Sequence, residues 1–503
     1  MAKLTSTIDW EVKDGTLIIS GTGEMPDYTS SKSKPWSSMA SIIKRILIED
    51  GITKIGDYTF YKDFESGSTS SAYYLEYINI PASVVSIGTS AFQSCKVKVV
   101  VINGSLNNVG SSGLNINTGS SVVDVALIFK GNKPVSGSVP SGSSYLSVVT
   151  NGWGGNTNFN CGTNVTWDLD LPTRTLTITS AGGITVSNNR AFDAFSDVIW
   201  KIVIGNELKT ISSNSFSNIY NVRKVIIGKD VISINNTFRC LVAEFVPGEK
   251  VSVGDSTFPD FNMSKPLIDI SGGRVVSGLS DSLHKTTNHQ CGTNATWDYD
   301  EQTGTLTISG TGATSNVTSG YSLFDALLSS CKKIIIGEGI TTIGTKFFYH
   351  DLMGSNTAVL EISLPTTLTT IKSQAFYDAF AGVDLEIPKN VNRIEDDAFY
   401  NSSVKMVSLS ILSDNIELGK NIWDFNGSNK TSIVIMNCVP KLIATGNTPF
   451  MTGKDALFFG ICTVVDSVFT FASKNFNDYK PVLIKRTVGW DVINNRNHID
   501  KTS

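Results

Sequence analysis

The histidines of the chain offer little for catalysis or metal binding. Only His284, His289, His350 and His498 occur among the 503 residues. None of them stands at a metal-ligand spacing or beside a plausible nucleophile motif, so we expect no histidine-based catalytic triad. His284 and His289 are better explained as part of a solvated loop.

Acidic residues are clustered in three places. Asp168 with Asp170, and Asp298 with Asp300, repeat as D-x-D. Their oxygens could bind calcium, but no EF-hand loop follows and Asp is favoured in turns, so we interpret both pairs as turn residues. The acidic run 395–397 could supply the carboxylates of a glycoside hydrolase, but the repeat pattern described below places it at a solvated corner. We therefore expect no catalytic residue, no metal site and no cofactor.

The cysteines fit neither a zinc site nor a C-x-x-C redox motif. Two of them lie six residues before a tryptophan, and Leu4 takes the same position before Trp10, so an apolar residue is an acceptable substitute there. We therefore expect buried thiols and not disulfides. The seven residues are Cys95, Cys161, Cys240, Cys291, Cys331, Cys438 and Cys462.

Composition excludes some classes of partner. The chain has 41% apolar and 17% charged residues and a formal charge of -4, which gives no reason to expect nucleic acid or an anionic membrane as a partner. Its opening, MAKLTSTIDW, lacks the apolar core of a secretory signal, and no run reaches the roughly 18 apolar residues of a transmembrane helix. From these observations the chain is either cytosolic or a mature form without its leader.

The elements that position all these residues are internal repeats. Seven units share apolar residues nine, seven and three positions before an isoleucine, and a phenylalanine four or five positions after it. A period in the twenties predicts a solenoid, because each unit is too small to bury its own apolar face. Two apolar residues two positions apart predict a short strand, which a Pro or Gly ends in most units. The isoleucines are Ile55, Ile87, Ile211, Ile234, Ile343, Ile371 and Ile394, and the phenylalanines are Phe60, Phe92, Phe216, Phe238, Phe348, Phe376 and Phe399.

The segments LEISLPTTLTTIKSQAF and DLEIPKNVNRIEDDAF, 23 residues apart, resemble the BspA-like leucine-rich repeats of bacterial and protist surface proteins. The resemblance covers most of residues 8–480. It departs from the family pattern at Phe238, which comes one residue early, and at several inserted loops. The resemblance implies a curved solenoid outside the cell, often binding host or partner macromolecules, and favours a mature extracellular or cell-surface form whose leader has been removed.

Three Trp-led segments, around Trp10, Trp167 and Trp297, each predict a β-hairpin before a set of repeats. Such a hairpin would cap the open apolar end of a repeat stack. The fold class expected is therefore a β-rich repeat solenoid of leucine-rich-repeat type, with short strands, few helices and β-hairpin caps. We expect modules at 1–150, 151–287 and 288–486, with a tail at 487–503. A short helix from Asp466 or Ser467 and the late Tyr479 would form a C-terminal cap.

The outward side chains of the strands are the candidate binding face. They lie ten and eight positions before each isoleucine, and the row is basic and aliphatic in the earlier repeats and acidic in the last two. The residues are Arg45, Tyr77, Lys201, Val203, Lys224, Ile226, Lys333, Ile335, Glu361, Asp384 and Glu386. A regular array on a sheet is how solenoids recognise proteins or glycans.

The function expected is a non-enzymatic secreted or cell-surface protein that binds a host or extracellular protein, or a glycan. The lysines of the row would meet an acidic or polar partner, with no nucleic acid bound and no membrane insertion. One alternative is a spacer without a ligand of its own, in which the row is solvated or covered by another part of the chain. A glycan-active β-solenoid enzyme is the other, and the acids Glu361, Asp384 and Glu386 are the only cluster on neighbouring strands that would suit it.

Overall fold

The described part of the chain is almost entirely β-structure, as the repeats predicted. Its helices are the 3-10 helices η1 (Ser37–Met39) and η2 (Asp193–Val198) and the α-helix α1 (Asp325–Leu328). A computed structural model describes residues 1–31, 33–64, 75–116, 125–137, 140, 146–150, 165–180, 192–211, 216–254, 256–259, 265–318, 322–350, 359–379, 383–400, 408–411, 413, 415–424, 432–436, 441–443, 450–451 and 456–460. The solenoid fold class is confirmed.

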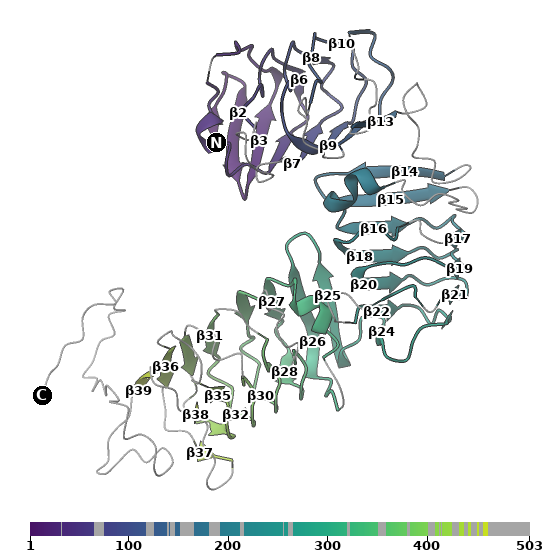
Figure 1. Ribbon diagram of the computed structural model, residues 1–503. Helices are drawn as coiled ribbons and strands as arrows, with labels where there is room; N and C mark the ends of the chain where they lie inside the picture. Colours follow the sequence, from purple (N-terminus) through teal and green to yellow (C-terminus); the bar gives the residue numbers. More distant parts are fainter. Residues whose placement is uncertain are drawn as a thin grey trace, which may run out of the picture. The chain divides into compact units, whose positions relative to one another are not determined.

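The strands form two parallel walls, because each turn of the chain contributes a longer strand to one sheet and a shorter one to the other (Figure 1). We call these the long-strand sheet and the short-strand sheet. In module 1 the long-strand sheet contains β1 (Ala2–Lys3), β2 (Ile8–Lys13), β3 (Thr16–Gly21), β5 (Arg45–Ile48), β7 (Leu75–Ile80), β9 (Val97–Ile102), β11 (Val125–Phe129) and β13 (Leu146–Thr150). Its short-strand sheet contains β4 (Gly23–Glu24), β6 (Ile52–Ile55), β8 (Ser86–Ile87), β10 (Asn108–Val109) and β12 (Ser136–Gly137).

Module 2 repeats this arrangement with its own pair of sheets. Its long-strand sheet contains β14 (Val165–Asp170), β15 (Thr175–Ser180), β16 (Lys201–Ile204), β18 (Val222–Ile227), β20 (Cys240–Phe245), β22 (Leu267–Ile270) and β24 (His284–Thr287). The short-strand sheet contains β17 (Thr210–Ile211), β19 (Ser233–Ile234), β21 (Val251–Val253) and β23 (Val276–Ser277). Modules 1 and 2 form one compact unit, made of Met1–Phe261 and Lys265–Thr287.

Module 3 lies in the second compact unit, made of Asn262–Ser264 and Asn288–Ser503. Its long-strand sheet is in two parts, the first with β25 (Gly292–Asp300), β26 (Thr305–Thr314), β27 (Lys333–Ile336) and β29 (Glu361–Ser363), the second with β31 (Asp384–Ile387), β33 (Ser408–Ile411), β36 (Ser432–Met436) and β39 (Ala456–Gly460). Its short-strand sheet continues from the end of β26 through β28 (Ile340–Ile343), β30 (Thr370–Ile371), β32 (Arg393–Ile394), β34 (Glu417–Leu418) and β37 (Lys441–Leu442). A further pair is β35 (Trp423–Asp424) with β38 (Phe450–Met451).

The predicted core positions lie between the two sheets. The five apolar positions of all seven repeats are buried, with the exceptions of Ile362 and Leu364, which are half-buried. One turn that the repeat pattern had missed is also regular. After Phe92 the same spacing continues through Val100 to Val109 with the buried Leu114 in place of the phenylalanine. A search that requires isoleucine and phenylalanine cannot find such a turn.

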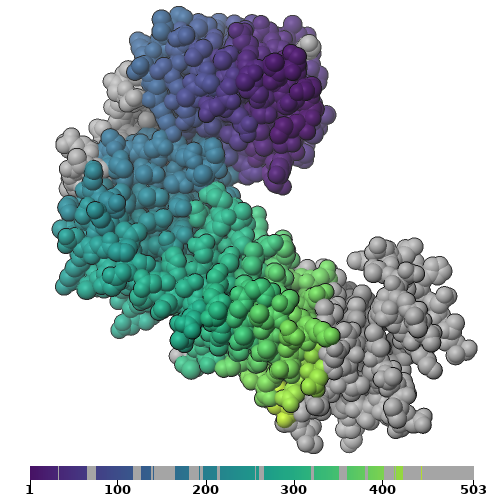
Figure 2. All heavy atoms as spheres, turned by 180° about the vertical axis from the view of Figure 1, so that it is seen from behind, coloured from purple at the N-terminus to yellow at the C-terminus, as the bar shows by residue number. Residues whose placement is uncertain are grey.

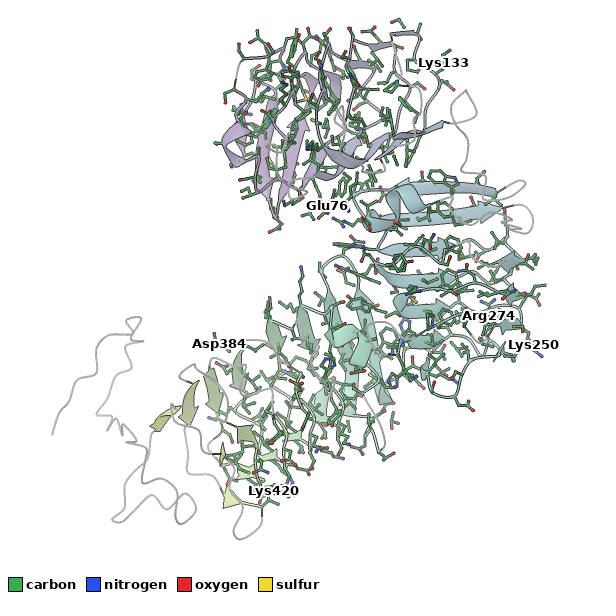
Figure 3. All side chains as sticks on the ribbon, viewed as in Figure 1. Glu76, Lys133, Lys250, Arg274, Asp384 and Lys420 are labelled. Carbon is green, nitrogen blue, oxygen red and sulfur yellow. The ribbon has the colours of Figure 1, made fainter. Side chains whose placement is uncertain are left out.

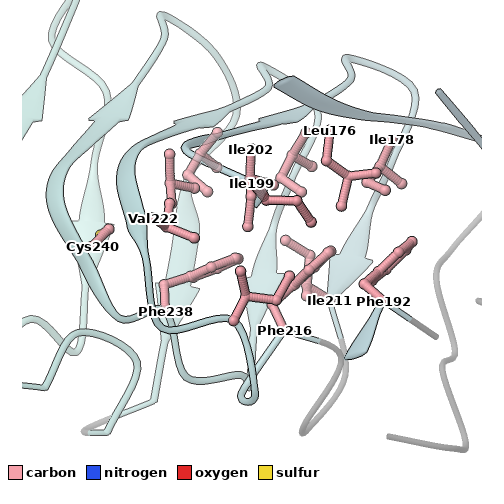
Figure 4. Packing of buried hydrophobic residues seen from close by; sticks show 14 of the residues in the cluster. Leu176, Ile178, Phe192, Ile199, Ile202, Ile211, Phe216, Val222, Phe238 and Cys240 are labelled. Atoms are coloured by element: carbon pink, nitrogen blue, oxygen red, sulfur yellow. The ribbon is translucent and has the colours of Figure 1, made fainter. Parts of the chain in front are cut away.

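Stacked aromatic rings run through each module along the core. In module 3, Phe376 lies between Phe348 and Phe399, with ring centroids 5.1 and 5.4 Å away and interplanar angles of 13° and 6°. Module 2 has the same arrangement around Phe216 and Phe238, whose centroids are 5.3 Å apart (Figure 4). Each stack begins one turn earlier than the sequence predicted. Its first rings are Trp36, Phe192 and Phe324, each 24 residues before the first repeat phenylalanine of its module.

The three hairpins close the starts of these stacks. Trp10, Trp167 and Trp297 pair with Ile19, Ile178 and Ile308 in the same antiparallel register. Each indole meets the first ring of its stack edge-on, at centroid distances of 5.9, 5.9 and 6.3 Å. Only Trp297 is fully buried, whereas the other two tryptophans are half-buried. The second strand of every hairpin is also the first rung of the parallel ladder, since β3, β15 and β26 pair with β5, β16 and β27.

Polar side chains connect successive turns. The buried guanidinium of Arg274 donates hydrogen bonds to six backbone carbonyls, among them that of Val231 at 2.6 Å and that of Glu249 at 2.8 Å (Figure 3). Burial lowers the pKa of this guanidinium.

At an exposed turn, Asp27 accepts a 2.8 Å hydrogen bond from the backbone N–H of Asp57, and this bond lowers the pKa of the Asp27 carboxyl.

The turn before five of the repeat phenylalanines has a left-handed backbone. The residues two positions before them have φ near +55° although they are not glycine, for example Tyr58 at 52°, Lys346 at 55°, Gln374 at 56° and Asp397 at 57°. Asn236, two positions before Phe238, does not share this conformation. This conformation costs an ordinary residue roughly 1–2 kcal/mol. The turn therefore keeps a fixed geometry in successive repeats at a cost to stability.

The predicted C-terminal cap, with its helix from Asp466 or Ser467 and Tyr479, and the tail at 487–503 lie outside the described residues.

Candidate binding surface

The predicted outward residues do lie on one face of the long-strand sheet, but their exposure differs between modules. Strand register places Arg45 opposite Tyr77, Lys201 opposite Lys224, and Lys333 opposite Glu361. Period-two alternation puts these side chains on the side of the sheet that faces away from the aromatic stack. We call this side the outer face.

The outer face of module 1 is covered, so the prediction that Tyr77 is available to a partner is wrong. Tyr77 is 4% exposed and belongs to the same buried cluster as Val198 and Ile199, which come just before the first repeat strand of module 2. The neighbouring outward residues of β9 and β11 are apolar and buried in this cluster too: Val99, Val101, Ala126 and Ile128. In the space-filling view the atoms of modules 1 and 2 meet without a gap (Figure 2).

Charged and aromatic side chains surround this covered face. Arg174 of module 2 forms an ion pair with Glu76, which is labelled in Figure 3. The guanidinium of Arg174 lies 3.8 Å from the ring centroid of Trp200. Arg223 lies 3.5 Å from the same ring, so Trp200 is held between two guanidinium groups. Arg45, which the sequence assigned to the binding face, lies 3.7 Å from Glu76. The same carboxylate pairs with Arg174 of module 2, so Arg45 lies beside the contact between the modules.

In module 2 the row is partly withdrawn from solvent. Lys224 is 7% exposed and its ammonium lies 2.7 Å from the carboxylate of Glu244 on the next strand. The expectation that Lys224 is an exposed contact residue is therefore wrong, because its side chain is buried and its ammonium group lies against the carboxylate of the neighbouring strand. Lys201, Val203 and Ile226 are half-buried.

In module 3 the outer face is largely open. Glu361, Asp384 and Glu386 are exposed, and Lys333 and Ile335 are half-buried. The ammonium of Lys333 lies 2.5 Å from the Glu361 carboxylate. Figure 3 shows Asp384 on this side of the ribbon. The exposed part of the predicted row is thus acidic and belongs to module 3.

The described residues contain no group of three or more His, Cys, Asp or Glu side chains that could hold a metal ion. The acidic run 395–397 has structural partners: Glu395 accepts a 3.2 Å hydrogen bond from the Ser373 N–H, and Asp396 accepts one of 2.8 Å from the Lys420 N–H. At the hairpin turns, Asp300 accepts a 2.8 Å hydrogen bond from the Gln302 N–H, as expected of a turn residue.

The sequence analysis did not identify one buried acid–base pair, His350 with Asp325. The Nδ1 atom of His350 lies 2.8 Å from the Asp325 carboxylate, and both side chains are excluded from solvent. The hydroxyl of the nearby Ser322 donates to the Phe347 carbonyl and so does not face the histidine as a nucleophile. The pair joins α1 to the following turn. The sequence did contain a signal for this pair. Asp325 directly follows Phe324, and His350 lies two residues after Phe348, so both lie beside rings of the aromatic stack.

Four cysteines lie in the described residues, and all are free and buried: Cys95, Cys240, Cys291 and Cys331. This agrees with the expectation of buried thiols. Burial raises the pKa of the Cys291 thiol to about 12 and that of Cys331 to about 11. Neither thiol has the thiolate character that a nucleophile needs near neutral pH.

Comparison with known proteins identifies the repeats. The BspA type leucine rich repeat region matches in six copies over residues 66–122, 173–264 and 317–444, more than half of the 503 residues. No curated protein matches the sequence. Among the described residues, no helix has the length and apolar character to cross a membrane.

Solved structures that resemble the chain include other leucine-rich repeat proteins. One from Eubacterium ventriosum is 18% identical, with 79% of this chain and 93% of that one covered and a TM-score of 0.22. The pneumococcal vaccine antigen PcpA is 15% identical, with coverage of 92% and 93% and a TM-score of 0.21. A leucine rich cell surface protein of Faecalibacterium prausnitzii is 14% identical, with coverage of 88% and 95% and a TM-score of 0.22. Similarities this low carry no conclusion about a ligand.

Proposed function

The chain belongs to the BspA-type leucine-rich repeat family, and we propose that it is a non-enzymatic binding protein of the cell surface or extracellular space. The partner is a host or other extracellular protein, or a glycan. It binds the outer face of the long-strand sheet in module 3, around Glu361, Asp384 and Glu386, with Ile335 contributing apolar contact. No cofactor takes part.

The observation that carries this proposal is the contrast between equivalent faces. In module 1 the outer face is apolar and covered, with Tyr77 only 4% exposed. In module 3 the same positions carry the exposed acids Glu361, Asp384 and Glu386. A face of regularly spaced charged side chains suits a macromolecular partner, since such a surface gains affinity by area and by electrostatic steering.

The sign of the charge points to a different partner from the one that the sequence predicted. The sequence favoured an acidic partner for Lys201, Lys224 and Lys333. Lys224 is buried beside Glu244, and Lys333 lies against Glu361. The exposed part of the face therefore favours a partner with basic or polar groups.

A spacer is the second candidate function. It is supported by the covered face of module 1 and by Arg174 of module 2, which forms an ion pair with Glu76 and lies 5.6 Å from the ring centroid of Tyr77 in module 1, because such a contact fixes one module against the next. A spacer would need no exposed recognition face on module 3.

A binding screen with charge-reversal variants tests the proposal. The purified chain is screened against extracellular-matrix proteins and a glycan array, and any ligand is then measured with Asp384→Lys/Glu386→Lys. The control is Glu49→Lys/Asp50→Lys, which changes the net charge equally at two exposed residues of module 1. We expect at least about tenfold weaker binding for the module 3 variant only. Equal binding by both variants would refute the outer face of module 3 as the binding site, and a screen that finds no ligand would favour the spacer.

A further inference from the structure

The hairpin that opens module 3 extends its outer face beyond the predicted row. In β25, buried and exposed residues alternate from Ala295 to Asp300. The same outward side continues across β26 and β27, because Thr307 pairs with Asp298 on one side and with Ile335 on the other, and this register reaches β29 (Figure 1). We call these outward positions the hairpin face. They are Thr296, Asp298, Asp300, Thr305, Thr307, Ser309, Lys333, Ile335, Glu361 and Ser363.

Hydroxyl and carboxylate groups dominate the hairpin face. Five of its ten side chains carry a hydroxyl group and three carry a carboxylate, against one ammonium group and one aliphatic side chain. Asp298, Ser309 and Glu361 are exposed, and Thr307 is half-buried. The face therefore has a surplus of two negative charges. It attracts a cationic ligand and offers that ligand hydrogen-bonding groups at the regular spacing of the strands.

Module 2 has the same arrangement, and there the equivalent carboxylate already binds an amino group. The sequence T-W-D-x-D of β14 is repeated in β25. Asp168 is the counterpart of Asp298, because each pairs with the middle threonine of the T-L-T-I segment in the next strand. The ammonium group of Lys130 from module 1 lies 2.6 Å from the Asp168 carboxylate. The position of Asp298 thus suits a primary amine.

The composition of the hairpin face argues against a protein as its ligand. Where module 2 packs on module 1, the contact has an apolar centre that includes Tyr77, Val99 and Ile128. Protein interfaces usually have such a centre, with aromatic and aliphatic residues and few Ser or Asp. On the hairpin face Ile335 is the one aliphatic side chain, and it is half-buried. A ligand made mainly of hydroxyl groups matches this surface better.

We propose that the hairpin face binds a polysaccharide that carries free amino groups. This inference rests on the proposed function and selects one class among its partners. Successive strands lie about 4.8 Å apart, close to the length of one sugar residue, so a polysaccharide that runs across the strands meets one strand with each sugar. Asp298 and Glu361 pair with its amino groups, and the hydroxyls of Thr307 and Ser309 exchange hydrogen bonds with those of the sugars. The affinity comes from many weak contacts along the polymer.

Three matched probes test the class of ligand. A glucosamine oligosaccharide is titrated into the full chain in a calorimeter at mildly acidic pH, where its amino groups are protonated and exposed carboxylates remain ionised. The N-acetylated oligosaccharide of equal length keeps the sugar but not the charge, and an oligolysine with the same number of charges keeps the charge but not the sugar. We expect both to bind at least about tenfold more weakly. Equal binding of oligolysine would overturn the inference, because charge alone would then explain the affinity.

Substitutions test whether the oligosaccharide occupies the hairpin face. Asp298→Asn/Glu361→Gln removes two exposed charges with little change of shape, and we expect it to weaken binding about fivefold or more. Thr307→Val removes a hydroxyl group from a side chain of the same shape, which should weaken binding about threefold. The control is Glu49→Gln/Asp50→Asn, which removes the same charge from two exposed residues of module 1. Unchanged binding by both hairpin-face variants would refute the site.

The inference and the proposed function fail on different results. A protein from the screen whose binding depends on Asp384 and Glu386, with no response to the oligosaccharide, would leave the proposed function standing and overturn the inference. Oligosaccharide binding that depends on Asp298 and Glu361, with no ligand in the screen that depends on Asp384 and Glu386, would support the inference and refute those two acids as contact residues.

Discussion

Replacing Phe376 by alanine is the sharpest test of the repeat register. The side chain is fully buried, and its ring lies 5.1 and 5.4 Å from those of Phe348 and Phe399. A Phe→Ala change in such a core costs about 3–5 kcal/mol through lost burial and the cavity that remains. The two ring contacts account for about 0.5–1.5 kcal/mol each within that total. We expect a loss of unfolding free energy near the upper end of the range.

Two further variants are controls for this experiment. Phe376→Leu should cost much less, about 1.5 kcal/mol, because the chain itself places the buried Leu114 at the equivalent position of module 1. Tyr377→Ala removes a half-buried ring that stacks on Tyr349 at 4.6 Å and on Tyr400 at 5.3 Å. It should cost about 1 kcal/mol, because much of this ring is already in contact with water.

Scanning calorimetry and urea unfolding measure these effects. Because the chain has two compact units, a single two-state transition is not expected. The unit with module 3 should melt earlier in Phe376→Ala, and the transition of the other unit should not move. An alanine variant that melts like the parent, or a leucine variant as unstable as alanine, would show that the ring does not fill a tightly packed stack.

Three other predictions address the polar and backbone features. Arg274→Met should lower the unfolding free energy of the first unit by about 3 kcal/mol or more in urea unfolding, because several buried carbonyls lose their donor; a loss below about 1 kcal/mol would contradict this. The Asp27 carboxyl has a lowered pKa, so its stabilising effect is present above its unfolded pKa of about 3.9 and lost as the pH falls through the lower folded value. Asp27→Asn should therefore be less stable than the parent at pH 7, and the difference should shrink as the pH falls below the unfolded pKa; a pH-independent difference between the two melting temperatures would refute the assignment. Gln374→Gly should raise the unfolding free energy by about 0.5 kcal/mol, because glycine tolerates φ of 56°, whereas the same change at Lys372, outside that conformation, should lower it.

The repeat register was predictable because it depends on local spacing. Ile334 and Ile336 are two positions apart, which places both on one side of a strand wherever the strand lies. The hairpins were predictable for the same reason. The first ring of each stack was missed although Trp36, Phe192 and Phe324 lie 24 residues before a repeat phenylalanine, because their turns lack the other apolar positions of the pattern.

The exposure of the outer face depends on distant residues, so local spacing could not settle it. Tyr77 occupies an outward position on its strand, and it is buried because residues of module 2 pack against it. A signal did exist in VKVVVI at 97–102 and VALIF at 125–129. Continuous apolar runs are typical of strands buried on both faces, whereas alternation of apolar and polar residues is typical of strands with one face exposed to solvent.

The antiparallel first strand of each hairpin bears on fibre formation. A ladder of identical parallel rungs would end in an edge on which a second molecule could continue the same register, and repetition of that step would build a filament. In β14 and β25 the chain direction is reversed relative to every rung that follows. A neighbouring molecule that met such an edge would face a different hydrogen-bonding pattern, with an indole over the end of the aromatic stack. In module 1 the edge is the two-residue β1, which pairs with β2 and is too short to continue the ladder. Each module thus begins with a segment that resists head-to-tail polymerisation.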